Sequence, residues 1–132
     1  MKKIRLFKGF NKKNDLLVQE INDAHKNLPS WVIIYAFARK NERKGSISGF
    51  FESRQVMKIN FLGVDEKFQG QGIGGALLNA CVDYAINRNV SEIHVETART
   101  WQAVCFYKKH GFEHVGRKNL LIKRIGAKTA EK

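Results

Sequence analysis

The stretch Val64–Gly75, VDEKFQGQGIGG, is the most informative part of this 132-residue sequence. The apolar run Val56–Val64 predicts a strand before it, and Ile73–Arg88 carries apolar residues at helical spacing after it. A strand therefore runs into a glycine-rich turn that opens a helix. Glycines let the backbone approach a ligand closely. The unpaired amides and the dipole of the first helical turn make such a turn an anion site, and a pyrophosphate fits it.

Two other interpretations of this turn are weaker. Gly70, Gly72 and Gly75 match the G-x-G-x-x-G spacing of dinucleotide-binding Rossmann domains. Those domains carry the motif after an early strand, with a long parallel domain behind it. Here three antiparallel-looking strands precede the turn and fewer than sixty residues follow. A purely structural turn is also disfavoured, because several glycines at a helix start cost stability without a ligand to justify them.

Outward from this turn, the sequence predicts a mixed sheet flanked by helices. The predicted strands are a first one around Ile4, then 31–39, 46–53, 56–64, 93–97, 112–116 and 119–125. The predicted helices are 11–27, 73–88 and 100–110. Pro29 closes the first helix, and Gly111 suits a left-handed cap after the last. Consecutive strands followed by strand–helix alternation predict a mixed, mostly antiparallel sheet of the α/β (α+β) class.

Length and composition predict one domain, residues 1–126, with a polar tail at 127–132. No apolar run approaches the ~20 residues of a membrane span, and no signal-peptide pattern follows the basic start, so we expect a cytoplasmic protein. Cys81 and Cys105 both fall in helix-like apolar patterns, which predicts small buried residues rather than a disulfide or a metal site. The four histidines show no ligand spacing, so no metal is expected.

The net charge of +12, from 24 Lys and Arg against 12 Asp and Glu, favours an anionic partner without naming one. A solvated basic surface, a nucleic acid and a polyphosphate cofactor all fit it. The basic residues are spread along the chain, and no basic run with interleaved aromatics stands out. Charge alone therefore favours the plain basic surface, and a nucleic-acid partner is allowed but not expected.

Two segments resemble the signatures of the GNAT N-acetyltransferase superfamily. Gln69–Gly74, QGQGIG, is similar to the coenzyme A signature Q/R-x-x-G-x-G/A, and Gln102–Phe112 resembles the second signature, a helix with Tyr followed by K-x-G-F. The resemblance covers about residues 31–125. It implies the GNAT fold, with six to seven strands and splayed fourth and fifth strands. It also implies acetyl transfer from acetyl-CoA to a small-molecule or peptide amine acceptor, without a metal, by a monomer or homodimer.

The resemblance also implies roles for single residues. Backbone groups of Leu62 and Val64 would meet the pantetheine arm and the acetyl carbonyl, and amides of the glycine-rich turn would cradle the pyrophosphate. Tyr107 would protonate the leaving thiolate, for which its ordinary pKa of about 10 is suitable; a plain core aromatic is the alternative. The implied cofactor-binding residues are Leu62, Gly63, Val64, Gln69, Gly70, Gln71, Gly72, Ile73, Gly74, Gly75, Thr100, Ala103 and Phe106.

The sequence departs from the family pattern at two positions. Thr100 stands where family members often have an Asn that contacts the pantetheine, and it fits a plain helix N-cap equally well. Lys58 stands where histone acetyltransferases have a general-base Glu. The base therefore stays open between His94, Glu96 and an ordered water. These departures leave an alternative function, a basic nucleic-acid- or ribosome-associated binding module on a GNAT scaffold with weak or lost catalysis.

Overall fold

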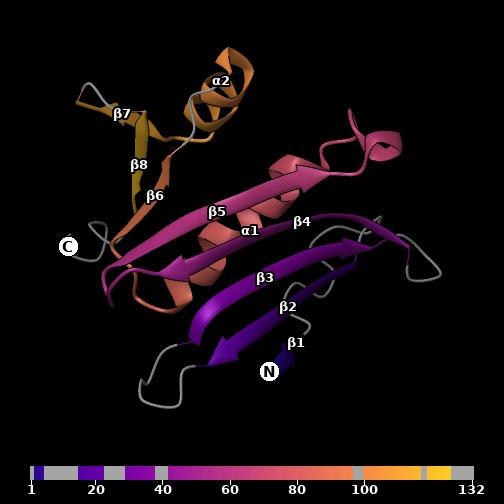
Figure 1. Ribbon diagram of the computed structural model, residues 1–132, viewed down its shortest axis with the longest axis horizontal. Coiled ribbons are helices and arrows are strands. Elements are labelled where there is room, and N and C mark those ends of the chain that lie inside the picture. Colours follow the sequence, from indigo (N-terminus) through magenta and orange to yellow (C-terminus); the bar gives the residue numbers. More distant parts are fainter. Residues whose placement is uncertain are drawn as a thin grey trace.

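The computed structural model describes residues 2–4, 15–22, 29–37, 42–96, 100–116 and 119–125. These residues form one mixed sheet and two α-helices (Figure 1). The strands are β1 Lys2–Ile4, β2 Asp15–Asn22, β3 Pro29–Phe37, β4 Arg43–Phe51, β5 Val56–Val64, β6 Glu92–Glu96, β7 Glu113–Val115 and β8 Leu120–Arg124. The helices are α1 Ile73–Asn87 and α2 Trp101–Lys109, and the 3₁₀ turn Glu66–Phe68 precedes α1.

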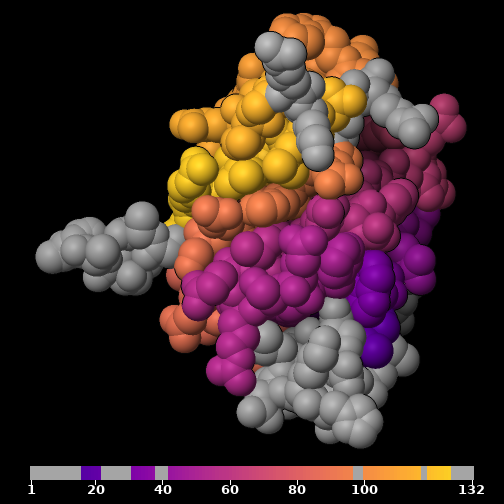
Figure 2. All heavy atoms as spheres, turned by 60° about the vertical axis from the view of Figure 1, so that its left-hand side comes forward, coloured from indigo at the N-terminus to yellow at the C-terminus, as the bar shows by residue number. Residues whose placement is uncertain are grey.

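The sheet has the strand order β1-β2-β3-β4-β5-β6-β8-β7. All neighbours are antiparallel except β5 and β6, which are parallel because α1 connects them. The predicted mixed, mostly antiparallel sheet is therefore confirmed, with eight strands in the described residues where six to seven were expected. In the space-filling view, β8, β6 and the β4–β5 hairpin follow one another across the visible face in this order (Figure 2).

The predicted helix 11–27 is wrong, because its central part is strand β2. Leu16, Val18 and Glu20 are buried on one face of β2, while Ile21 is exposed on the other. This period-two pattern coexists in the sequence with a helical one, and pairing along nearly the whole of β3 selects the strand. The rest of the predicted helix, the predicted domain limits and the polar tail at 127–132 lie at least partly outside the described residues.

The core lies between the sheet and α1, which packs on one face against β3, β4 and β5 (Figure 1). The helix buries one apolar stripe there, formed by Ile73, Leu77, Leu78, Ala80, Cys81, Tyr84 and Ala85. The prediction of a buried cysteine is right for Cys81 and wrong for Cys105, which is exposed. Within α2 only Val104 and Tyr107 are buried, so Cys105 falls on the solvent side.

A buried polar cluster ties β2 to α1. The Tyr84 hydroxyl donates a hydrogen bond to the carboxylate of Glu20, and the Arg88 guanidinium pairs with the same carboxylate. Burial, together with the hydrogen bond to Glu20, raises the pKa of Tyr84 well above its usual range. A carboxylate with 4% of its side chain exposed needs such partners, because an unpaired buried charge is strongly unfavourable.

The parallel strands β5 and β6 separate after a short paired region, as Figure 1 shows. They pair from Val56 opposite Glu92 to Ile59 opposite Val95 and no further. On the β4 side, Ile59 pairs with Gly49 and Phe61 with Ser48, so Asn60 is the extra residue of a β-bulge. A bulge bends its strand, and β5 follows β4 beyond it while β6 turns away. The expected splay is confirmed here at β5 and β6.

Candidate active site

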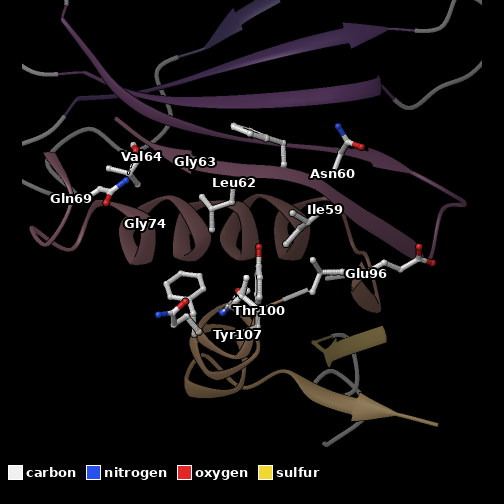
Figure 3. Close-up of a pocket in the computed structure, with 15 residues that line it drawn as sticks. Ile59, Asn60, Leu62, Gly63, Val64, Gln69, Gly74, Glu96, Thr100 and Tyr107 are labelled. Carbon is white, nitrogen blue, oxygen red and sulfur yellow. Dashed lines mark hydrogen bonds between the residues drawn. The ribbon is translucent and has the colours of Figure 1, made fainter. Parts of the chain in front are cut away.

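A cleft of about 710 Å³ opens where β5 and β6 part. Strand β5 forms one wall, the start of α1 closes one end, and β6 and α2 form the other wall (Figure 3). The lining residues are Ile59, Asn60, Phe61, Leu62, Gly63, Val64, Gln69, Gly74, Val95, Glu96, Thr100, Gln102, Ala103, Phe106 and Tyr107. The cleft is thus mostly apolar, with a few polar groups, which is the usual composition of a small-molecule site.

The glycine-rich turn, of which Gln69 and Gly74 line one end of the cleft, carries amides without backbone partners. Gly70 and Gly72 have φ angles of +83° and +82°, and a Cβ built on either would meet nothing within 4 Å. The first backbone bond of α1 runs from the Ala76 amide to the Gly72 carbonyl, 3.0 Å. Within the described residues, the amides from Gly70 to Gly75 therefore have no backbone acceptor. Open space and unpaired donors at a helix N-terminus suit a phosphate group.

Gln69 has a second role in this turn. Its side-chain amide Nε2 donates to the Val64 carbonyl at 3.1 Å, which ties the turn to the end of β5. Asp65 holds the other side, since its carboxylate accepts from the Lys67 amide at 3.3 Å. These bonds hold the turn at the end of β5 without using the amides from Gly70 to Gly75.

Most of the predicted cofactor-binding residues meet in the cleft. Eight of the thirteen line it together with Tyr107, namely Leu62, Gly63, Val64, Gln69, Gly74, Thr100, Ala103 and Phe106, whereas Gly70, Gln71 and Gly72 are not among the lining residues. Ile73 instead buries its side chain in the core. Gly75 faces α2, where an added Cβ would lie 3.3 Å from Nε2 of His110. The roles of these residues stay predictions.

Several lining residues carried no signal in the sequence. Ile59, Phe61 and Val95 read as ordinary strand residues, and Asn60 joins them only through the bulge. Gln102 is on the first turn of α2, beside the cleft. The second signature covers Gln102, but this residue lines the cleft only because α2 stands against the diverging strands.

Tyr107 combines a packed ring with a hydroxyl at the cleft. Its side chain belongs to the buried core, with the residue 6% exposed, and the ring meets Phe106 and Phe112 edge to face at 5.2 and 5.3 Å. Figure 3 shows it reaching from α2 across the cleft toward β5. Burial raises the pKa of Tyr107 to about 12. The two interpretations, core aromatic and proton donor, are therefore compatible at this residue.

Thr100 caps the helix that carries Tyr107. Its hydroxyl accepts a hydrogen bond from the Ala103 amide at 3.1 Å, and its own backbone is extended. This is the usual geometry of an N-cap. Since Thr100 also lines the cleft, the cap sets where α2 begins relative to β5.

Neither candidate base faces Tyr107. His94 pairs through Nε2 with the Glu92 carboxylate at 2.8 Å and does not contribute to the cleft lining among the described residues. Glu96 does line the cleft, but its carboxylate lies 3.0 Å from the Lys58 ammonium and points away from Tyr107 in Figure 3. The arrangement therefore places neither group next to the tyrosine hydroxyl.

The described residues contain neither a candidate metal-ion cluster nor a candidate membrane-spanning helix. No group of three or more His, Cys, Asp or Glu side chains in that part of the chain is placed to hold a metal ion. Neither of its helices is both long and apolar enough to cross a membrane.

Comparison with known proteins identifies relatives of this fold and sequence. The family described as "Acetyltransferase (GNAT) domain" matches residues 35–120. An uncharacterized N-acetyltransferase of Methanocaldococcus jannaschii is 41% identical over 64 residues, which cover 47% of this chain and 28% of that protein. The chain thus matches less than a third of that curated relative's length.

Solved structures share the fold at low sequence identity. A GNAT family acetyltransferase from Elizabethkingia anophelis, solved with acetyl-CoA bound, aligns with a TM-score of 0.66 at 19% identity, covering 87% of this chain and all of that one. The paiA N-acetyltransferase from Thermoplasma acidophilum, solved with coenzyme A, aligns with a TM-score of 0.65 at 18% identity, covering 74% and 62%.

Proposed function

Because this chain belongs to the GNAT acetyltransferase family, we propose that it moves an acetyl group from acetyl-CoA directly to an amine. One observation carries the proposal. The cleft between β5 and β6 joins a turn of unpaired amides at one end to the Tyr107 hydroxyl on its far wall. An anion cradle and a proton-donating group on the same cleft are what a long phosphate-bearing thioester requires.

The chain's own groups fit the phosphate end of such a ligand. The open space at Gly70 and Gly72 would be filled by any side chain, and the amides that follow have no acceptor in the described residues. The edge of β5 from Asn60 to Val64 has lost its β6 neighbour, so its backbone groups are available to the pantetheine arm. Leu62 is the best placed of these, because the Val64 carbonyl is already bonded to Gln69.

Acetyl-CoA, when bound, supplies a thioester whose carbonyl carbon accepts the amine and whose sulfur leaves. The neutral amine forms the C–N bond as the C–S bond breaks, and the amine proton passes to water. Tyr107 donates a hydrogen bond to the departing sulfur. With a pKa of about 12 against roughly 8.5 for a thiol, it stabilises the thiolate without giving up its proton completely. Most of the rate then comes from positioning in the cleft.

The positions of the two candidate general bases, His94 and Glu96, favour water as the acceptor of the amine proton. His94 is paired with Glu92, and Glu96 is drawn to Lys58. We therefore assign the loss of the amine proton to solvent in the cleft rather than to a fixed side chain. No contact among the described residues favours the alternative function of a nucleic-acid-binding module.

The test combines binding with transfer. Calorimetry should find acetyl-CoA binding in the micromolar range or tighter, which corresponds to ~8 kcal/mol or more. Thiol release with a panel of primary amines then measures transfer. Absence of binding would refute the cradle, and binding without release for any amine would refute the transfer. A salt-sensitive rise of the melting temperature with RNA but not with acetyl-CoA would favour the binding module instead.

A further inference from the structure

A second hollow of about 610 Å³ lies beside the cleft at the start of β4 and the end of β5. Its lining residues are Arg43, Lys44, Gly45, Ser46, Phe61, Gly63, Val64 and Asp65. Gly45 faces α1, since a Cβ there would lie 3.4 Å from Cδ1 of Leu77. Ser46 follows it in the strand and therefore points to the opposite face of the sheet. The hollow thus opens on the face that α1 does not cover.

The hollow and the cleft share part of β5. Phe61, Gly63 and Val64 line both. Beyond Ile59 this strand has no β6 partner, so its edge is free where these shared residues lie. The ring of Phe61 lies on Gly63, where an added Cβ would come within 2.6 Å of the ring's Cζ. This ring, 54% exposed, is the partition between the two spaces.

The charge of the second hollow is positive. The Arg43 guanidinium stacks over the Tyr35 ring at 4.8 Å from the centroid, and no carboxylate of the described residues pairs with it. The Lys44 ammonium lies 5.3 Å from the centroid of Phe68. Asp65 is the one acidic residue of the lining, and its carboxylate already accepts from a backbone amide. The positive charge of the hollow therefore comes from Arg43, with which no carboxylate of the described lining pairs.

We propose that this hollow receives the acceptor and that Arg43 selects amines linked to an oxyanion, either a carboxylate or a phosphate. The proposal rests on the transfer proposed above and adds the substrate class. A guanidinium without a carboxylate partner binds such oxyanions through paired hydrogen bonds. Ser46 adds a hydroxyl donor to the lining. The exposed ring of Phe61 covers an apolar linker between the amine and the oxyanion.

The strand register sets the length of that linker. Ser46 lies opposite Gly63, at the level where the two hollows meet. The Arg43 guanidinium lies over the Tyr35 ring, and Tyr35 of β3 is paired with Ser46, so this cation lies two strands across the sheet from Gly63. At about 4.8 Å between neighbouring strands, the distance is roughly 10 Å. An acceptor whose amine reaches over Gly63 therefore carries its oxyanion roughly 10 Å from the nitrogen. An extended aminooctanoate has about this span.

The test compares acceptors that differ only in the oxyanion. Thiol release is measured with aminooctanoate, its methyl ester and the corresponding aminoalkyl phosphate. For the wild-type protein we expect a KM at least tenfold lower for the carboxylate or the phosphate than for the ester, with similar kcat. Of the carboxylate and the phosphate, the acceptor with the lower KM carries the preferred oxyanion. Equal KM values for all three acceptors, or a preference for the ester, would overturn the proposal.

Variants attribute the preference to Arg43. Arg43→Gln should raise the KM of the anionic acceptor at least tenfold, and leave the ester within twofold and acetyl-CoA affinity within threefold. Arg43→Lys keeps the charge but loses the paired geometry, so an intermediate KM is expected. Arg54→Gln, in the exposed turn at the other end of the β4–β5 hairpin, is the matched control and should change nothing. An equal effect of Arg43→Gln on the ester and on the acid would refute the assignment.

Direct binding separates this proposal from the transfer reaction. Calorimetry measures aminooctanoate and the phosphate against the protein saturated with coenzyme A, for the wild type and for Arg43→Gln. Arg43-dependent binding without thiol release would refute acetyl transfer while the oxyanion site stands. Transfer to neutral amines without Arg43-dependent binding would refute the oxyanion site alone. Failure of both measurements would refute both. Melting temperatures of all variants exclude loss of folding as the cause.

Discussion

Replacing Tyr107 with phenylalanine should slow turnover without destabilising the protein. The ring stays packed between Phe106 and Phe112, because the change removes only the hydroxyl. No described residue makes a hydrogen bond to that hydroxyl, so its removal leaves no buried partner without a hydrogen bond. We therefore expect the free energy of unfolding to change by less than about 1 kcal/mol.

The expected loss of rate follows from the role of the hydroxyl. General-acid assistance typically contributes ~100- to 10,000-fold. Because a pKa of about 12 limits Tyr107 to partial proton donation and water can substitute in part, we expect at least a tenfold fall in kcat. That fall corresponds to about 1.4 kcal/mol of barrier. Acetyl-CoA affinity should stay within about threefold of wild type. Steady-state thiol release and calorimetry on the same samples measure both quantities.

Tyr84 offers a matched control, since it is also a buried tyrosine but bonds to Glu20 away from the cleft. Tyr84→Phe removes a hydrogen bond to a buried carboxylate and should cost about 1–3 kcal/mol of unfolding free energy. Its turnover should stay near wild type. Tyr107→Phe is thus expected to lower turnover but not stability, and Tyr84→Phe to lower stability but not turnover. Unchanged kcat in Tyr107→Phe would remove Tyr107 from the mechanism, and a loss of turnover in both variants would point to a general effect of packing.

The other predictions concern the turn, the base and pH. Gly72→Val should weaken acetyl-CoA binding at least tenfold in calorimetry, because it fills the cradle at a φ of +82°. Gly74→Ala adds only ordinary contacts, so it should keep binding and raise stability by about 0.5–1 kcal/mol in chemical denaturation. Equal binding by the valine variant would contradict the cradle. Alanine at His94 or Glu96 should cost less than tenfold in kcat, and a hundredfold loss at one of them would identify a base. Burial raises the pKa of Tyr107 from 10.0 to about 12, so the unfolded chain loses this proton at lower pH than the folded protein. The free energy of unfolding should therefore fall as the pH rises from the first value to the second, and it should fall less in Tyr107→Phe.

The glycine-rich turn was predictable because its properties are local. A strand that ends in Val64 and a helix that starts at Ile73 leave few residues for the turn, and positive φ angles there call for glycine. The helix cap at Thr100 and the left-handed Gly111 are local in the same sense. Such features depend on neighbours within a few residues, which the sequence contains in full.

The first predicted helix was wrong for the opposite reason. Leu16, Leu17 and Ile21 fit a helical stripe, and Leu16 and Val18 fit an alternating strand equally well. The choice came from β3, which offers a partner for nearly every residue of β2, and from the core, which buries Leu16 and Val18 on one face of the strand. A partner more than ten residues away in sequence leaves no mark in the segment itself.

The family, the glycine-rich turn and the tyrosine on α2 could all be predicted from the sequence, because each depends on residue type and short spacing. The position of the cleft became clear only from the folded chain, since it depends on the bulge at Asn60 and on where β6 stops pairing. The folded chain also shows that Lys58 draws Glu96 away from Tyr107 and that Arg43 shares a hollow with Phe61. Strand register brings these side chains together, and register is a property of pairing between distant segments.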